Sequence, residues 1–184
     1  METTAPRVAV IYATAQGSTR EIADYIGAYL TARGATVEVA DVEHAPELTL
    51  FDAIVLGSAV HDLALLPEMT EFVRSHRHEL RAYPVWLFSV GLGPALVGPT
   101  GRRIGSVVPR KIAALRDSIK PRGFHAFAGH YERVGVSLPA RALYRVLGGA
   151  RYGDLRDWSD ITVWTDTIAQ ALHLPQAQAT PTHP

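Results

Sequence analysis

The sequence contains no cysteine among its 184 residues. This absence excludes disulfides, thiolate nucleophiles, cysteine-ligated iron–sulfur clusters and thiolate zinc sites. Long hydrophobic runs are also missing, since the apolar stretch 84–90 is far shorter than the roughly 20 residues that a membrane-spanning helix needs. Residues 1–6 lack the basic and apolar pattern of a secretory signal. We therefore expect a protein of the cytoplasm.

Acidic residues are scarce in the second half of the chain. Residues 1–79 carry 12 acids and 5 bases, a net charge of −7, whereas residues 80–184 carry 6 acids and 13 bases, a net charge of +7. The loops of the second half should therefore attract anions. An ordinary solvated rim, an anionic substrate, an acidic partner and a lipid surface all fit this pattern. Nucleic acid is not expected, because the pI is about 7.1 and no basic-aromatic motif occurs.

Short apolar segments predict the strands of the fold. They alternate little between apolar and polar residues, as is typical of parallel strands that helices cover on both faces. The five segments are 7–13, 37–40, 53–57, 84–89 and 123–129.

Segments with helical spacing lie between the apolar segments. They are 18–33, 67–78, 109–118 and 158–172, the second with a proline in its first turn. Asp157 is placed to cap the last helix, and its neighbours Arg156 and Trp158 are expected in the cap and its packing. The order predicts one α/β domain over residues 1–174, with helices on both faces of a parallel sheet. Residues 175–184, rich in Pro, Thr, Ala and Gln, should form a disordered tail.

Three loops follow strands and so occupy the carboxyl edge of the predicted sheet, where such folds bind ligands. They are 14–19, 58–66 and 90–105. The first loop leads directly into a helix, where free backbone N–H groups and the hydroxyls of Thr14, Ser18 and Thr19 favour an anion. Gly17 lets the backbone come close. Without a basic residue in the loop, a phosphate monoester fits better than a triphosphate; a helix cap without ligand is the alternative.

Other motifs carry less chemistry. His76 and His78 lack a third ligand at a usual spacing, so no metal site is predicted. Gly91-Leu-Gly93 has no third glycine at position 96 and is no dinucleotide fingerprint.

One combination of motifs resembles the flavodoxin superfamily. It consists of Thr14-x-x-Gly17-x-Thr19 after the first strand, Gly57-Ser58 at the end of the third, and a glycine-rich loop after the fourth. The resemblance implies a three-layer fold around a five-stranded parallel sheet of order 2-1-3-4-5, with FMN as cofactor.

Within that superfamily, the chain looks most like the quinone-linked protoporphyrinogen dehydrogenases and their flavodoxin-domain relatives. The likeness runs over residues 7–172 and includes 17–23, 51–58 and the pair Gly148-Gly149 followed by Asp157-Trp158. It implies an FMN-dependent oxidoreductase that acts on an anionic or aromatic small molecule, with a quinone as a candidate electron acceptor. The acid-free stretch 90–116 fits a substrate-facing enzyme. The alternatives are a flavodoxin-type electron carrier that serves larger redox partners and a descendant that has lost the flavin.

The resemblance also implies which residues hold FMN. The phosphate would be bound by Thr14, Gln16, Gly17, Ser18 and Thr19, the isoalloxazine ring lined by Ser58, Ala59, Val60 and His61, and its pyrimidine edge met by Val90, Gly91, Leu92 and Gly93.

This sequence departs from the flavodoxin pattern in two ways. Gln16 stands where flavodoxins usually have threonine, and residues 58–66 lack the aromatic that commonly stacks on the ring. A stacked aromatic contributes about 1 kcal/mol, so its loss weakens binding without preventing it. His61 or Tyr131 could take its place beside the ring, and His61 is the candidate catalytic proton donor near N5; a surface histidine is the alternative.

Residues 136–149 mix apolar positions with Arg141 and Arg145 and predict a short basic amphipathic helix. In the quinone-linked dehydrogenases a similar region approaches the membrane, which implies weak peripheral contact at its inner face. An ordinary helix packed beside the active site is the alternative.

Overall fold

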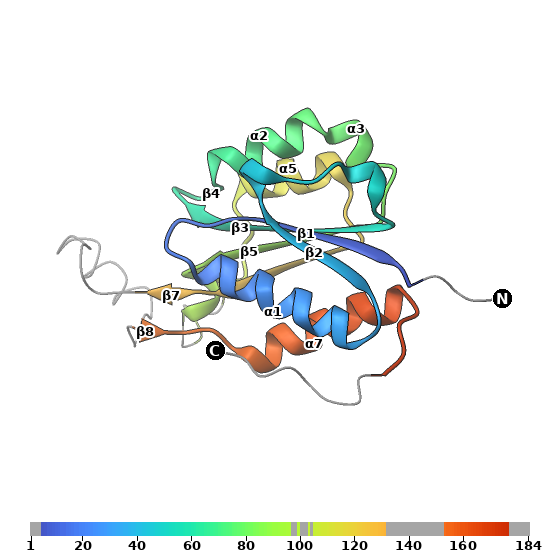
Figure 1. Ribbon diagram of the computed structural model, residues 1–184. Helices are drawn as coiled ribbons and strands as arrows, with labels where there is room; N and C mark the ends of the chain where they lie inside the picture. Colours follow the sequence, from blue (N-terminus) through green and yellow to red (C-terminus); the bar gives the residue numbers. More distant parts are fainter. Residues whose placement is uncertain (1–4, 97–98, 100–102, 104, 132–152, 177–184) are drawn as a thin grey trace.

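The computed structural model describes residues 5–96, 99, 103, 105–131 and 153–176. Its centre is a parallel sheet of five strands, in the order β2-β1-β3-β5-β6 (Figure 1). In chain order among these five parallel strands, this is the predicted arrangement 2-1-3-4-5, which is confirmed. The strands are β1 (Arg7–Ala13), β2 (Thr36–Asp41), β3 (Ala53–His61), β5 (Val85–Gly91) and β6 (Gly123–Ala128).

Helices cover both faces of the sheet (Figure 1). On one face lie α1 (Ser18–Ala32) and α7 (Trp158–Ala171), and on the other lie α2 (Pro67–Ser75), α3 (Arg77–Leu80) and α5 (Arg110–Ile119). The predicted helix 67–78 is thus divided at His76, while the other predicted helices are confirmed within one or two residues. The cap of the last helix is also confirmed, because the Asp157 carboxylate accepts from the backbone N–H groups of Ser159 at 3.0 Å and Asp160 at 3.1 Å.

Short elements complete the described chain. β4 (Ala64–Leu65) folds back against β3, and β7 (His130–Tyr131) pairs antiparallel with β8 (Gly153–Asp154). The 3-10 helices are η1 (Val42–His44), η2 (Leu48–Leu50) and η3 (Gly93–Ala95). The predicted helix 136–149 lies outside the described residues, as does most of the predicted tail. No helix in the described part of the chain is long and apolar enough to cross a membrane.

The sheet separates two apolar clusters because successive strand residues point to opposite faces. On β1, Val8 and Val10 pack toward α1 and α7, whereas Ala9 and Ile11 pack toward α2 and α5. All four are fully buried, as the near-continuous apolar composition of the strand predicts.

Aromatic rings fill the cluster on the α1 and α7 face. Phe88 of β5 lies 5.8 Å from Phe127 and 5.9 Å from Trp164, measured between ring centroids. The space for the Phe88 ring comes from Gly57 on the neighbouring strand, where a Cβ atom would lie 2.0 Å from the ring. This contact explains a glycine within an otherwise apolar strand.

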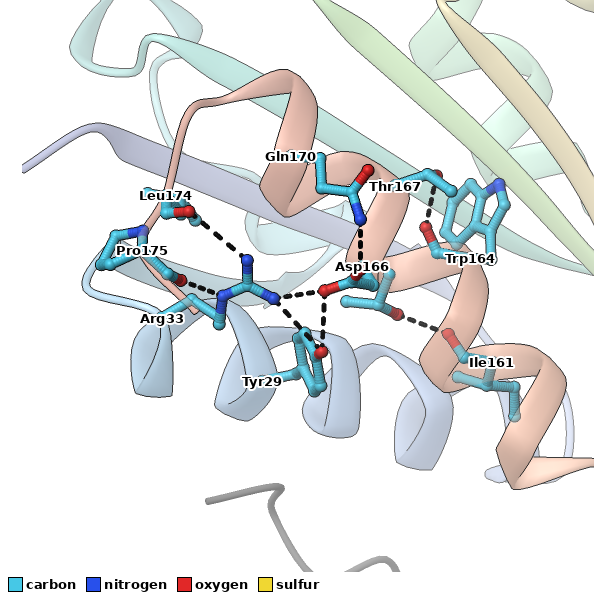
Figure 2. Close-up of polar contacts among 10 residues, drawn as sticks. Tyr29, Arg33, Ile161, Trp164, Asp166, Thr167, Gln170, Leu174 and Pro175 are labelled. Carbon is cyan, nitrogen blue, oxygen red and sulfur yellow. Dashed lines mark hydrogen bonds and ion pairs between the residues drawn. The ribbon is translucent and has the colours of Figure 1, made fainter. Parts of the chain in front are cut away.

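A buried arginine fastens the end of α1 to α7 and the chain that follows it (Figure 2). The side chain of Arg33, only 5% exposed, pairs with Asp166 and donates to the carbonyl oxygens of Leu174 and Pro175. Tyr29 also donates to Asp166, at 3.0 Å. Buried charge is tolerated here because each group has partners of opposite charge or polarity.

Candidate functional site

The three loops named from the sequence meet at the carboxyl edge of the sheet. The register pairs Ala13, the last residue of β1, with Ser58 of β3, and pairs Ala59 with Val90 of β5. The loops that follow these strands are therefore neighbours. In Figure 1, β4, β7 and β8 lie at the same end of the sheet as the turn from β1 into α1.

The start of α1 has hydrogen-bond donors that no side-chain cap satisfies. The backbone N–H of Gly17 donates to the Thr14 Oγ1 at 3.0 Å, so the Thr14 hydroxyl hydrogen stays available for a ligand. Gly17 has φ of +94° and nothing lies within 4 Å of the position of its missing Cβ. No side chain caps α1, and the first N–H groups of a helix have no partner inside the helix. Gln16 is exposed.

Thr19 carries the strongest indication of a ligand in this loop. Its side chain is fully buried, and its Oγ1 is the one buried side-chain polar atom of the described residues without a hydrogen-bond partner. An unpaired buried hydroxyl costs about 1–3 kcal/mol. A ligand oxygen at the start of α1 would remove that cost.

The second loop is a β-hairpin rather than an irregular loop. β3 continues to His61 and pairs with β4 across Asp62 and Leu63, whose φ angles are +49° and +59°. Two left-handed residues in succession are typical of a type I′ turn, which normally uses Asn-Gly or Asp-Gly. Because Asp-Leu is no turn signal, the sequence did not predict this hairpin.

Ser58 has a structural task at the base of the hairpin. Its fully buried hydroxyl accepts from the Leu66 N–H at 3.0 Å and donates to the Ala59 carbonyl at 2.9 Å. The hydroxyl is therefore already used within the loop. Ala59 and Val60 are partly exposed beyond it.

His61 projects from the hairpin into solvent. Its side chain is 76% exposed, and its Nδ1 lies 3.3 Å from a carboxylate oxygen of Asp62. Leu63 at the tip is also exposed, at 69%. The hairpin thus exposes two titratable side chains, His61 and Asp62, and one apolar side chain, Leu63.

The third loop packs closely against the hairpin. Val90 is buried, while Gly91, Leu92 and Gly93 are partly exposed. A Cβ on Gly91 would lie 3.2 Å from the Cβ of Val60. The second and third loops are therefore in contact where they leave the sheet.

Gly129, Leu155 and Arg156 complete the edge, and sequence reasoning did not place these three residues there. A Cβ on Gly129 would lie 3.3 Å from the Ser18 Oγ, and the Gly129 carbonyl accepts from the Leu155 N–H at 3.3 Å. Arg156 follows and pairs with Glu21 in the first turn of α1. Only tertiary structure brings these distant segments together.

The pKa values of two acidic groups in this region are shifted. Hydrogen bonds from Arg156 hold the pKa of Asp154 below its ordinary value, against the effect of burial. Burial raises the pKa of Tyr12 at the end of β1. The described residues contain no group of three or more His, Asp or Glu side chains that could hold a metal ion.

The fold and these loops define a doubly wound α/β protein whose first strand leads through a glycine turn into an uncapped helix N-terminus. The chain belongs to the flavodoxin domain family, whose model matches residues 9–143. The family binds FMN. A search of curated proteins finds no match.

Solved structures support the fold. A cysteine-to-serine mutant of flavodoxin from Pseudomonas aeruginosa is similar with a TM-score of 0.55 and 15% identity, over 91% of this chain and 99% of that chain. Two-electron reduced flavodoxin from Megasphaera elsdenii is similar with a TM-score of 0.52 and 20% identity, over 78% of this chain and 99% of that chain.

A larger protein contains the same fold. Rubredoxin oxygen:oxidoreductase from Desulfovibrio gigas gives a TM-score of 0.58 and 14% identity, over 92% of this chain. This chain spans only 37% of that protein. At these identities the likenesses establish the architecture alone.

Proposed function

We propose that this protein binds FMN non-covalently and acts as an FMN-dependent oxidoreductase on an anionic or aromatic small molecule, with a quinone as a candidate electron acceptor. The observation that carries the cofactor assignment is the unpaired, fully buried hydroxyl of Thr19 at the start of α1. It stands in a flavodoxin domain whose first loop also has the open, left-handed Gly17.

The first loop would bind the phosphate of FMN. The hydroxyls of Thr14, Ser18 and Thr19 would donate to its oxygens, together with the free N–H groups and the positive end of the α1 dipole. The exposed amide of Gln16 would add a donor at the rim. Because residues 14–19 include no basic side chain, neutral donors would carry the binding, which suits a monoester.

The second and third loops would hold the ring. Ala59, Val60 and His61 would lie along it, and the backbone of residues 90–93 would meet its pyrimidine edge. Ser58 would act indirectly by fixing the hairpin through Leu66.

FMN supplies the redox chemistry when bound, exchanging one or two electrons with a substrate. The protein would orient the cofactor and the substrate, exclude water from the ring and supply protons. We assign His61 as a proton donor near N5 because its exposed imidazole stands on the hairpin beside the ring site. Replacing His61 with alanine should slow substrate turnover while FMN stays bound, and unchanged turnover would remove the assignment.

A second function is a flavodoxin-type carrier that passes electrons between larger proteins. The coverage of 99% of the Pseudomonas aeruginosa flavodoxin chain favours it, because an electron carrier of similar length has the same architecture. Such a carrier would show little activity with small substrates.

The visible spectrum of the purified protein, before and after addition of FMN, tests the cofactor assignment. A spectrum with flavin bands shifted from those of free FMN is expected, and a colourless protein without affinity for FMN would overturn it. Anaerobic turnover with small anionic or aromatic donors and a soluble quinone then separates enzyme from carrier. Rapid reduction of the quinone by the small donor without a protein partner supports an enzymatic function. Electron exchange only with partner proteins supports the electron-carrier function.

A further inference from the structure

The side chain of Arg156 is almost fully buried beside the phosphate loop, with 7% of its surface exposed. Its guanidinium contacts the carboxylate of Asp154 through Nε at 2.8 Å and Nη2 at 2.7 Å, and it also pairs with Glu21. The same group lies 4.7 Å from the centre of the Trp158 ring. Three elements are therefore joined at one cation: β8, the start of α7 and the first turn of α1.

This junction is attached to the proposed phosphate site through α1. The backbone N–H of Glu21 donates to the carbonyl of Gly17 at 3.0 Å, so the acid belongs to the turn that begins at the glycine of the loop. From the other side, the N–H of Leu155 bonds to Gly129, which lies against Ser18. Arg156 therefore borders the loop without being part of it.

Electrostatics give the junction a consequence for a bound phosphate. A carboxylate in the first turn stabilises the helix itself, but it repels an anion that binds at the same helix end. Glu21 is 47% exposed, and Arg156 is its partner in the ion pair. Removing the cation would leave the negative charges of Glu21 and Asp154 beside a doubly charged ligand.

We propose that Arg156 is a positioning residue for phosphate binding: it cancels the charge of Glu21 and fastens the 153–157 segment to the first turn of α1, and so favours a flavin that carries a phosphate monoester over one that does not. The proposal rests on the proposed function, since it assumes that FMN binds at this loop.

The test compares FMN with riboflavin, which has the same ring and no phosphate, by quenching of flavin fluorescence. Arg156→Met removes the charge and keeps an apolar stem against Trp158. Its affinity for FMN should fall about five- to tenfold at low salt and less at high salt, with riboflavin binding unchanged. Arg156→Lys should bind FMN more tightly than Arg156→Met.

A second substitution isolates the charge. Glu21→Gln alone should bind FMN as tightly as the wild type or more so, and Glu21→Gln combined with Arg156→Met should recover most of the lost affinity. The matched control is Arg116→Met, which removes an arginine paired with Asp117 on α5, on the opposite face of the sheet. It should leave the ratio of FMN to riboflavin affinity unchanged.

Each outcome separates the possibilities. Equal losses for FMN and riboflavin in Arg156→Met, or no recovery in the double variant, would overturn the proposal and leave Arg156 a purely structural residue. If the wild type binds neither flavin, the proposed function itself fails and this inference fails with it. Should Arg156→Met unfold, Arg156→Lys and Glu21→Gln still provide the comparison.

Discussion

At the scale of single residues, the buried and unpaired hydroxyl of Thr19 costs stability in the free protein and would donate to the phosphate of FMN. Thr19→Val keeps the shape of the side chain and removes the unpaired hydroxyl. We expect the free energy of unfolding without FMN to stay equal or rise by about 1 kcal/mol, because the buried polar group is gone. FMN affinity should fall, because a donor to the phosphate is lost.

Urea unfolding and an FMN titration check both parts of this prediction. Thr165→Val is the control, since the Thr165 hydroxyl is also fully buried but donates to the Ile161 carbonyl at 2.7 Å. It should leave FMN affinity unaffected. Unchanged FMN binding in Thr19→Val would contradict a ligand role for the hydroxyl.

Gly57 sets the packing of the central strands. In Gly57→Ala the new methyl group would lie 2.0 Å from the Phe88 ring, so strand or ring must move. The unfolding free energy should drop by about 1–3 kcal/mol, the usual cost of overpacking. Thermal unfolding measures it. Gly57→Ala with Phe88→Leu should recover part of the loss; no recovery would show that the ring is not the obstacle.

At the scale of elements, the hairpin after β3 carries local backbone strain. Leu63 holds φ of +59° at an exposed tip, a conformation that costs a non-glycine residue about 1–2 kcal/mol. Leu63→Gly creates the Asp-Gly pair that type I′ turns favour, and we expect a gain of about 0.5–1 kcal/mol in unfolding free energy. Chemical denaturation tests it. Leu50→Gly, at an exposed position outside the left-handed region, should bring no gain, and an equal gain there would refute the explanation.

The elements also show how far sequence patterns reach. The parallel strands were predictable because burial on both faces leaves a continuous apolar run, and α7 because Asp157 marks its start. The break between α2 and α3 at His76 was not predictable, because neither glycine nor proline marks it. The centroid of the His76 ring lies 4.4 Å from that of Phe72, and the His76 Nδ1 contacts the Phe72 carbonyl oxygen.

The candidate site also has a part that local sequence predicts and a part that depends on distant segments. The first loop could be predicted because its donors follow one another in the chain. The contact of Gly129 with Ser18 and the pair of Arg156 with Glu21 join segments more than 100 residues apart. Arg156 was expected in the cap and packing of α7 rather than as a catalytic group, and its pairing with Glu21 was not predicted, because local spacing has no information about such partners.

At the scale of the whole molecule, the ion pair of Arg33 with Asp166 makes the free energy of unfolding depend on pH. Burial opposes ionisation of Asp166, but hydrogen bonds from Arg33, Tyr29 and Gln170 outweigh it and hold the pKa of Asp166 below its ordinary value. The carboxylate therefore stabilises the fold fully above its unfolded pKa of about 3.9, and this contribution is lost as the pH falls through the lower folded pKa.

Asp166→Asn should lower the unfolding free energy by about 3 kcal/mol near pH 7, because the buried Arg33 loses its ionic partner. The difference from the wild type should shrink as the pH falls below about 4. Urea unfolding from pH 3 to pH 7 measures both curves. Asp117→Asn, which removes an exposed carboxylate on α5, should change stability little; curves for Asp166→Asn and wild type that stay parallel down to pH 3 would contradict the assignment.

The position of α7 in the chain has a consequence for synthesis. The apolar face beneath β1, β3 and β5 is closed by Ile161, Trp164 and Ile168. While the ribosome is still translating the earlier segments, α1 is the one described helix that covers this face, and the nascent chain exposes apolar surface until α7 has left the exit tunnel. Chaperone binding during translation should therefore decrease once α7 has emerged. Ribosomes stalled just before Trp158 should carry chains that a protease cuts readily, whereas chains that extend beyond Pro175 and have left the tunnel should resist the protease.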